Sequence, residues 1–290
     1  MASQYSTILT SDSSTTVNQY DVIKYSDYEN LKTKYETALS NLQSKYDTLY
    51  NKVYSVPSSF YNLRVEGGGI IFFDWKYGFT STTPENGDTY SYALRITADT
   101  TSDLGDYYYN KITGTVQCSR VGDKHRFYVV AESDLTGSVV AWDATAPSTS
   151  RGTSTGFGTG KANTTLLCNA ITNDMWPLVK TARSVNPGGH DLVSDDSALD
   201  TRWFVPSRDE SCTISNMQHP DSSHRPSGIP QLSISYSAGT MKETYWTSSE
   251  DPSTSSFIRL MALDSDGYGV SGSSSTFKSS TEYVRLCRTF

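Results

Sequence analysis

The sequence is poor in cysteine. Its 290 residues include four cysteines, and none of them belongs to a Cys-x-x-Cys pair. This wide spacing excludes a zinc ribbon and a dense disulfide scaffold, both of which need closely spaced cysteines. An isolated cysteine packs as a small hydrophobic residue, so we expect free and buried thiols at Cys118, Cys168, Cys212 and Cys287.

Positive charge and long apolar runs are also scarce. Lysine and arginine number 24 against 31 acidic residues, the net charge is −7, and no basic cluster occurs. Because phosphate neutralisation needs clustered basic side chains, we expect no nucleic-acid partner. No run reaches the roughly 18 apolar residues of a membrane span, and the opening MASQYSTILTS lacks the basic and apolar regions of a secretion signal. We therefore expect neither membrane insertion nor Sec-dependent export.

What the chain does contain favours strands and turns. Charged residues make up 19% of it, whereas serine, threonine, glycine and tyrosine are frequent. Threonine and tyrosine favour strands, and serine and glycine favour turns. We predict an α+β protein in which one long helix precedes a β-rich domain.

The helix is predicted to begin after Ser26, a suitable N-cap with acidic residues following it in the first turn. Its apolar residues follow a heptad a/d spacing that drifts after Leu42, and Pro57 ends the pattern. The positions are Tyr28, Leu31, Tyr35, Ala38 and Leu42, then Leu39, Tyr46 and Val53 beside Leu49 and Val56, with Lys45 and Lys52 at the strict d sites.

A helix of about thirty residues with one apolar stripe cannot bury that stripe alone. We expect residues 1–60 to form an N-terminal segment with an amphipathic, coiled-coil helix that oligomerises the chain, with a homotrimer as the preferred state. The alternative is a helix that lies on the chain's own globular domain.

Beyond Val65 the pattern changes to short apolar runs between turn residues, which predict strands. The runs are EGGGIIFFDW, YSYALRIT, ITGTVQCS, HRFYVVAES and GSVVAW. Short helices are predicted at residues 162–170 and 176–181.

Three strings resemble site motifs and fail on inspection. TGFGTGKAN has Thr155 and Ala162 where a phosphate-binding Walker A loop needs glycine and serine or threonine. Cys212, His219 and His224 could supply three metal ligands, but the sequence suggests neither a fourth ligand nor a general base, so we expect surface histidines. DSDG at 264–267 lacks the glutamate of a calcium loop and reads as a turn. We predict no metal and no cofactor.

Five strings in one order carry a resemblance to a known family: GGGIIFFDW, STGFGTGKANT, TRWFVPSRDE, YWTSSE and EYVRLCRTF. Together they resemble the C-type-lectin-fold domain of bacterial and phage surface proteins, in particular the variable proteins diversified by retroelements. The resemblance covers residues 67–290. It implies a C-type-lectin-like ligand-binding domain at 61–290, with an insertion at about 83–117.

Each motif also has a physical interpretation of its own. Residues 203–205 form an apolar strand that Pro206 stops, and Ser207 with Glu210 has the spacing of a capping box. Residues 245–249 predict another strand. Tyr283, Val284, Leu286 and Cys287 predict the closing strand, and the calcium-binding tripeptides of animal lectins are absent from this chain.

The resemblance implies that the segment between the last two motifs is exposed and binds a ligand. This segment is rich in the residue types that diversification produces, chiefly Ser, Tyr, Asp, Gly and Thr. The candidate contacts are Tyr245, Thr247, Asp251, Ser253, Ser255, Arg259, Asp264, Asp266, Tyr268, Ser273 and Phe277. By this resemblance the chain is a phage tail receptor-binding protein and not an enzyme. It would be made in the host cytoplasm, sit in the virion at a tail fibre or tail tip, contact other tail proteins through its N-terminal segment, and bind a host cell-surface protein or glycan.

Two alternatives remain open at this point. An oxidase on the same fold needs a close pair of reactive cysteines, and neither Cys212 nor Cys287 lies in a matching motif. A structural fibre or adhesin subunit would have no diversified site, and its polar C-terminal segment would be ordinary solvated loop.

Overall fold

A computed structural model describes most of the chain: residues 25–80, 94–135, 140–143, 148–169, 202–219, 222–232, 234, 244–263, 269–270 and 275–290. The chain divides into two compact units, Met1–Val53 and Tyr54–Phe290. The second unit combines helices with several antiparallel sheets, so the α+β prediction is confirmed at that level.

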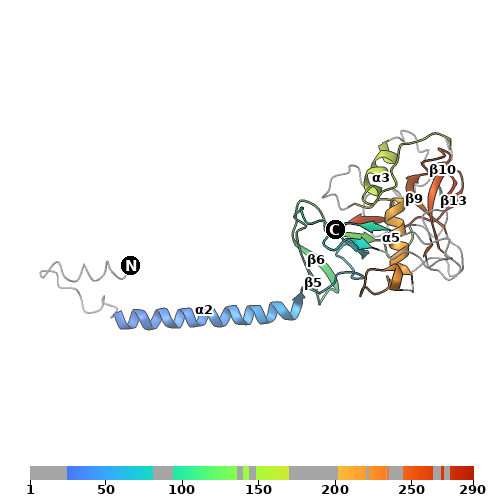
Figure 1. Cartoon of the computed structure of the whole chain (residues 1–290). Coiled ribbons are helices and arrows are strands. Elements are labelled where there is room, and N and C mark those ends of the chain that lie inside the picture. The colour runs from blue at the N-terminus through green and yellow to red at the C-terminus, as the bar shows by residue number, and fades with distance from the viewer. Residues whose placement is uncertain are drawn as a thin grey trace. The chain divides into compact units, whose positions relative to one another are not determined.

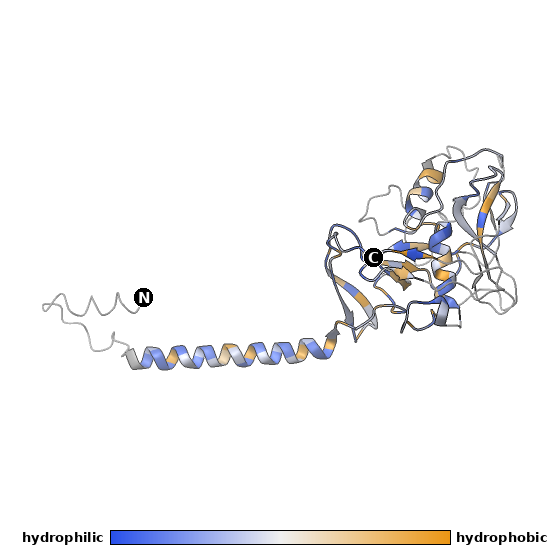
Figure 2. Ribbon diagram, viewed as in Figure 1, coloured by the Kyte–Doolittle hydropathy of each residue, from blue (hydrophilic) through white to orange (hydrophobic). Residues whose placement is uncertain are grey.

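Helix α2, Tyr25–Val53, is the described part of the first unit (Figure 1). It exposes its large apolar residues along its whole length, and hydrophobic and hydrophilic positions alternate along the ribbon in Figure 2. The helix ends four residues before Pro57 because Tyr54–Ser55 leaves the helical path and pairs, as strand β1, with β5. No helix in the described part of the chain has the length and apolarity that a bilayer crossing requires.

The second unit contains the predicted strands. Strand β2 corresponds to the first predicted run, β4 to the second, β6 to the third, β7 to the fourth and β8 to the fifth. The strands are β2 Ile70–Asp74, β3 Phe79–Thr80, β4 Arg95–Ile96, β5 Asp106–Asn110, β6 Thr115–Arg120, β7 Phe127–Val130, β8 Val140–Ala141, β9 Thr244–Glu250, β10 Phe257–Leu263, β11 Gly269–Val270, β12 Ser275–Phe277, β13 Thr281–Glu282 and β14 Cys287–Thr289.

A three-stranded antiparallel sheet in the order β14-β7-β2 forms the centre of this unit. Both of its faces are covered, which explains why β2 and β7 are continuous apolar runs and do not alternate with polar residues. Ile71, Phe127 and Val129 pack into one hydrophobic cluster. Phe73 and Val130 pack into a second cluster on the other face.

A second sheet carries the segment of interest. Strand β10 pairs with β9 along one edge and with β11 and β12 along the other. Strands β1-β5-β6 form a third sheet, and the pairs β13-β8 and β3-β4 complete the set among the described residues.

Two longer helices join these sheets: α3, Gly160–Asn169, which confirms the first predicted short helix, and α5, Arg208–Gln218. Helix α5 contacts both β2 and the strands β9, β10 and β11 (Figure 1). It begins with the predicted capping box, in which the Ser207 hydroxyl accepts a hydrogen bond from Glu210 N and the Glu210 carboxylate accepts one from Ser207 N. The second predicted short helix, at 176–181, lies outside the described residues.

Two predicted strands differ from the structure. Phe204 forms an isolated bridge to Cys287 instead of a full strand, because Pro206 has no N–H and its carbonyl accepts from Ser248 N. The closing strand begins at Cys287, since the carbonyls of Val284 and Leu286 accept from loop residues that follow β7.

Candidate functional site

Among the described residues of the predicted binding segment, the outward face of strands β10 and β12 presents aromatic, charged and hydroxyl side chains. Phe257 lies opposite Phe277, and Arg259 lies opposite Ser275. Directly opposed residues of an antiparallel pair share one face of the sheet. The intervening Ile258 is fully buried, so the face that carries the other four side chains is the outer one. We call Phe257, Arg259, Ser275 and Phe277, together with Asp251, the β10–β12 patch.

An aromatic pair forms the centre of the β10–β12 patch. The rings of Phe257 and Phe277 have centroids 4.4 Å apart and planes inclined by 37°. Phe277 keeps 55% of its surface exposed, and Phe257 is half-buried. A phenylalanine that is this exposed contributes little to folding and offers a large apolar area to a partner.

A charged pair lies beside the rings. The Arg259 guanidinium is 3.3 Å from the Asp251 carboxylate, and the two side chains are 20% and 10% exposed. The same carboxylate accepts a hydrogen bond of 2.8 Å from Ser253 N, and this bond shapes the turn between β9 and β10. Ser253 and Ser255 are exposed in that turn. The patch therefore combines apolar area, one charge of each sign and adaptable hydroxyl groups.

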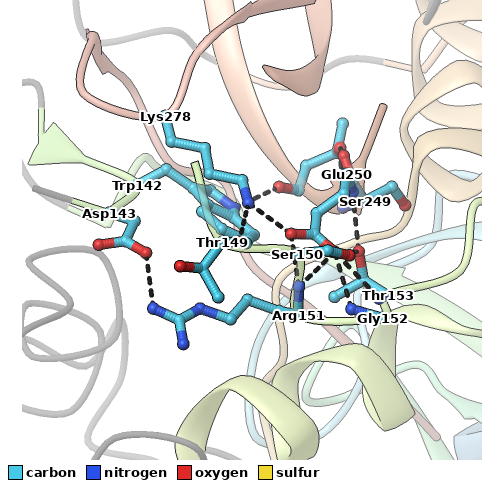
Figure 3. A network of polar contacts seen from close by, with 11 residues as sticks. Trp142, Asp143, Thr149, Ser150, Arg151, Gly152, Thr153, Ser249, Glu250 and Lys278 are labelled. Atoms are coloured by element: carbon cyan, nitrogen blue, oxygen red, sulfur yellow. Dashed lines mark hydrogen bonds and ion pairs between the residues drawn. The ribbon is translucent and has the colours of Figure 1, made fainter. Parts of the chain in front are cut away.

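A buried ion pair anchors the ends of the strands beneath this surface (Figure 3). The Lys278 ammonium, one residue after β12, lies 2.5 Å from the Glu250 carboxylate at the end of β9. The ammonium also donates to Thr149 O at 2.7 Å and lies 5.1 Å from the centre of the Trp142 ring. One side chain therefore connects β12, β9 and the loop at 148–153.

The Glu250 carboxylate organises that loop through backbone N–H groups. It accepts from Arg151 N at 2.8 and 2.9 Å and from Gly152 N at 2.9 Å. Gly152 has φ +76°, a conformation that residues with a side chain rarely adopt. The Arg151 guanidinium donates to the buried Asp143 carboxylate at 3.0 Å. The loop is thus held from both sides, as Figure 3 shows.

These contacts determine the protonation of Glu250. Burial alone would raise the pKa of its carboxyl group, but the Lys278 ammonium and the N–H groups of the loop outweigh burial, and the pKa is lowered below its ordinary value. Glu250 is therefore an anion at neutral pH and is satisfied by its neighbours. A carboxylate in this state acts as a structural anchor and is not available as a general acid.

The remaining polar residues of YWTSSE also face inward. The Ser249 hydroxyl donates to Ser154 O at 2.7 Å and accepts from Arg208 N at 3.0 Å. Asn163 donates from its amide to the Ser248 hydroxyl at 3.1 Å. The serines of this motif thus join β9 to α3 and α5, and three of the five recognised motifs meet at this point.

The structure divides the predicted contact residues into three groups. Ser253, Ser255 and Phe277 are exposed, and the half-buried Asp251 and Arg259 lie beside them. Tyr245 and Thr247 do not, because their side chains are 1% and 0% exposed. Asp264, Asp266, Tyr268 and Ser273 lie outside the described residues.

The placement of Tyr245 and Thr247 corrects the prediction. The Tyr245 hydroxyl donates to Asp134 at 3.3 Å, and the Thr247 hydroxyl donates to Arg259 O at 2.6 Å. Both hydroxyl groups are thus used inside the fold. The resemblance implies exposure at these two positions, but neither the resemblance nor the polar composition of the segment determines the direction of a side chain.

Sequence reasoning missed Phe257 and Ser275. Phe257 belongs to the apolar run FIRLMAL, in which the alternation of Phe257, Ile258 and Arg259 separates one face of the strand from the other. Ser275 could not be placed without its strand partner.

The alternative chemistries gain no support from the described residues. None of the four cysteines, all of which are described, is in a disulfide. Three are buried as expected, while Cys118 is half-buried. Burial raises the pKa of the Cys287 thiol well above its ordinary value, which disfavours the reactive thiolate.

The three residues considered as metal ligands, Cys212, His219 and His224, do not form a cluster in the structure. His224 is buried, contrary to the prediction of surface histidines, and its ring stacks on that of His219 at 3.7 Å. Cys212 lies within helix α5. Among the described residues, no three Cys, His, Asp or Glu side chains are grouped so that they could hold a metal ion.

Comparison of the chain with models of protein families, with curated proteins and with solved structures finds no match in any of the three.

Proposed function

We propose that this chain is a displayed binding protein of the phage tail receptor-binding type. In this proposal its second unit is a C-type-lectin-like domain of the retroelement-diversified class, and the β10–β12 patch contacts a host cell-surface protein or glycan. The observation that carries the proposal is the exposed Phe257–Phe277 pair beside the Arg259–Asp251 pair.

The chemistry of the patch suits recognition. Binding energy at protein interfaces is concentrated in a few aromatic and arginine side chains, and short polar residues adapt to the partner around them. The patch has two aromatic rings and one arginine, and the exposed Ser253 and Ser255 lie in the adjacent turn between β9 and β10. Aromatic faces and charged groups also suit a sugar ring with polar substituents, so the patch fits either class of host molecule.

The residues that hold strands β9, β10 and β12 in place differ from those that form the β10–β12 patch, and this separation also favours the proposed function. The Glu250–Lys278 anchor, the Ser248 and Ser249 hydroxyl groups and the core beneath them hold the strands from inside. The side chains of the patch are not among the groups that make these contacts, although the Asp251 carboxylate shapes the turn between β9 and β10. A surface of this kind can change its residues while the fold is kept, which is what diversification requires.

Helix α2 completes the proposal as an oligomerisation device, with a homotrimer as the proposed state and other tail proteins as partners of the N-terminal segment. Several weak sites that act together gain avidity of about 10² to 10⁴ without any new contact. A modest affinity at each patch would then be sufficient for attachment to a cell surface that carries many copies of the receptor.

The test uses intact bacterial cells as the probe. Fluorescently labelled full-length protein is incubated with a panel of strains, and retention is compared among wild type, Phe277→Ala and Arg259→Ala. Ile112→Ala is the matched control, because Ile112 is also an exposed apolar residue, 77% exposed, but lies in the turn between β5 and β6. We expect each patch variant to lose about tenfold or more in apparent affinity, and we expect the exposed Phe277→Ala to do so with an unchanged Tm.

Two outcomes would contradict the proposal. One is that no strain retains the wild-type protein, in which case a structural subunit without a receptor site becomes the better interpretation. The other is that Ile112→Ala loses retention as much as the patch variants do, which would show that retention does not depend on the patch.

A further inference from the structure

Helix α2 contains an internal repeat of eleven residues. Residues 31–41 read LKTKYETALSN, and residues 42–52 read LQSKYDTLYNK. The two copies share leucine at the first position, lysine at the fourth, tyrosine at the fifth and threonine at the seventh. Acidic residues, Glu36 and Asp47, occupy the sixth position of both copies. The apolar residues of α2 depart from a heptad after Leu42 because they follow a regular repeat of eleven residues.

The eleven-residue period keeps the apolar residues in line. Eleven residues in three turns give about 3.67 residues per turn, close to the 3.6 of a straight helix. With this period, the large apolar residues of α2 fall on one stripe about 100° wide. They are Tyr28, Leu31, Tyr35, Leu39, Leu42, Tyr46, Leu49, Tyr50 and Val53. A strict heptad would instead place Lys45 and Lys52 on the seam.

This stripe is open in the single chain. Its side chains from Tyr28 to Tyr50 are between 40% and 69% exposed. The helix has 29 residues and is therefore about 43 Å long. A surface of this length and apolarity on one helix is typical of an interaction surface rather than of a solvated helix.

The charges beside the stripe identify the partner. Lys34, Lys45 and Lys52 lie about 100° to one side of the stripe, and Glu29, Glu36 and Asp47 lie about 100° to the other side. All six side chains are exposed or nearly so. Asp27, in the first turn, and Lys32, four residues before Glu36, are the two exceptions within α2.

A helix with one basic flank and one acidic flank complements itself in only one orientation. When copies run parallel around an axis, each helix turns its basic flank toward the acidic flank of its neighbour, and Lys34 and Lys45 meet Glu36 and Asp47 at matching heights. In an antiparallel pair, the two-fold axis brings like flanks together, and the charges repel. The flanks thus favour a parallel assembly.

We propose that α2 associates with the same helix of further copies of this chain, parallel and in register, as a coiled coil with an eleven-residue repeat. Its supercoil is slightly right-handed, because the period exceeds 3.6 residues per turn. The inference deepens the self-association in the proposed function and does not depend on the ligand of the β10–β12 patch.

The first test measures the mass of the full-length protein by light scattering over a range of concentrations. Leu39→Ala with Tyr46→Ala removes two large side chains from the middle of the stripe, and alanine maintains the helix. Asn41→Ala with Thr48→Ala is the matched control on the opposite side of α2. We expect an oligomer for wild type and control, and a monomer for the stripe variant. A monomeric wild type, or equal masses for the two variants, would overturn the proposal.

The second test addresses orientation by charge reversal. Glu36→Lys with Asp47→Lys makes both flanks basic, and Lys34→Glu with Lys45→Glu makes both acidic. We expect each double variant to need about tenfold more protein for half-assembly, and the quadruple variant to recover the wild-type value. In an antiparallel assembly, each flank of one helix would lie against the same flank of its partner in every variant. The quadruple variant would then show no recovery of assembly, and the proposal would fail. This test measures mass and not retention by cells. A negative result would therefore contradict the coiled coil without contradicting the proposed receptor site.

Discussion

The Lys278 ammonium and the Glu250 carboxylate lie 2.5 Å apart, and their side chains are 0% and 5% exposed. The two charges come from the ends of different strands, and each also binds the backbone of the loop at 148–153. A buried charge is costly unless it is paired and hydrogen-bonded. The support of the β10–β12 patch therefore depends on both members of this pair.

Replacement of the lysine should destabilise the protein severely. Lys278→Met keeps the apolar stem and leaves the Glu250 anion buried without its ammonium partner. Loss of one member of a buried pair costs about 3–5 kcal/mol, so we expect Tm to fall by roughly 10 °C. Differential scanning calorimetry measures the change.

The matched control is an ion pair at the surface. Arg120 contacts both Asp103 and Asp106, but its side chain is 52% exposed. Arg120→Met should leave Tm almost unchanged, because water replaces the lost contacts. A similar fall in Tm for both variants would show that burial does not distinguish the two pairs.

The same carboxylate gives the protein a defined pH dependence. The pKa of Glu250 is lowered in the folded protein from its ordinary value of 4.5. A group of this kind stabilises the fold above pH 4.5 and ceases to do so as the pH falls through its folded pKa. The destabilisation caused by Glu250→Gln should therefore be largest near neutral pH and shrink below about pH 4.5.

Chemical denaturation of wild type and Glu250→Gln at a series of pH values measures this difference in the free energy of unfolding. The difference between the two proteins removes the contributions of all other carboxyl groups. A difference that stays constant from neutral pH to about pH 3 would show that the pKa of Glu250 is not lowered on folding.

Gly160 allows a test of how closely two recognised motifs approach each other. A Cβ at Gly160 would lie 2.1 Å from the Glu210 carboxylate, 2.8 Å from Ser207 N and 2.9 Å from Val205 O. Two of these atoms belong to the backbone and cannot move aside easily. Gly160→Ala should destabilise the protein by about 1–3 kcal/mol, although alanine favours a helix.

Gly156→Ala serves as the control for this substitution. A Cβ at Gly156 would meet its nearest neighbour, Thr159, at the ordinary distance of 3.8 Å. Its effect on the free energy of unfolding should be small. If Gly160→Ala were no more destabilising than Gly156→Ala, the two motifs would not approach each other as closely at Gly160 as the structure shows.

The sequence predicts correctly those elements that are determined by residues close to one another in the chain. The long helix follows from its apolar periodicity, the capping box of α5 from Ser207 and Glu210 three residues apart, and β2 from a continuous apolar run. In each case, neighbouring residues alone determine the hydrogen bonds or the buried face.

Side-chain direction in the polar strand β9 could not be predicted in the same way. Thr247, Ser248 and Ser249 resemble a solvated segment in composition, but all three are buried because the Asn163 side-chain amide of α3 and backbone groups of α5 and β10 bind their hydroxyl groups. These partners are distant in sequence. The Glu250–Lys278 pair was missed for the same reason.

Thr247 shows the energetic consequence of this burial. Its hydroxyl donates to Arg259 O at 2.6 Å and accepts from Ser249 N at 3.2 Å. Thr247→Val keeps the shape and removes both of these buried hydrogen bonds, which costs about 1–3 kcal/mol. Urea denaturation should detect this loss, whereas Ser253→Ala, at an exposed position, should have no measurable effect.

Arg288 connects the first and the last of the recognised motifs. Its guanidinium donates to Gly68 O at 2.8 and 3.2 Å and to Glu66 O at 2.5 Å, and it lies 5.3 Å from the centre of the Trp203 ring. Burial lowers the pKa of this group to about 10, which still leaves it charged at neutral pH.

Arg288→Lys keeps the charge but cannot reproduce the planar fork that reaches two carbonyl oxygen atoms at once. We expect a loss of about 1–3 kcal/mol in the free energy of unfolding, because the buried, charged Arg288 side chain loses at least one of its hydrogen bonds to the Glu66 and Gly68 carbonyls. Arg120→Lys, at an exposed position, should lose much less. If Arg288→Lys left the free energy of unfolding unchanged, a positive charge at this position would be sufficient. The geometry of the Gly67–Gly69 turn would then not require an arginine.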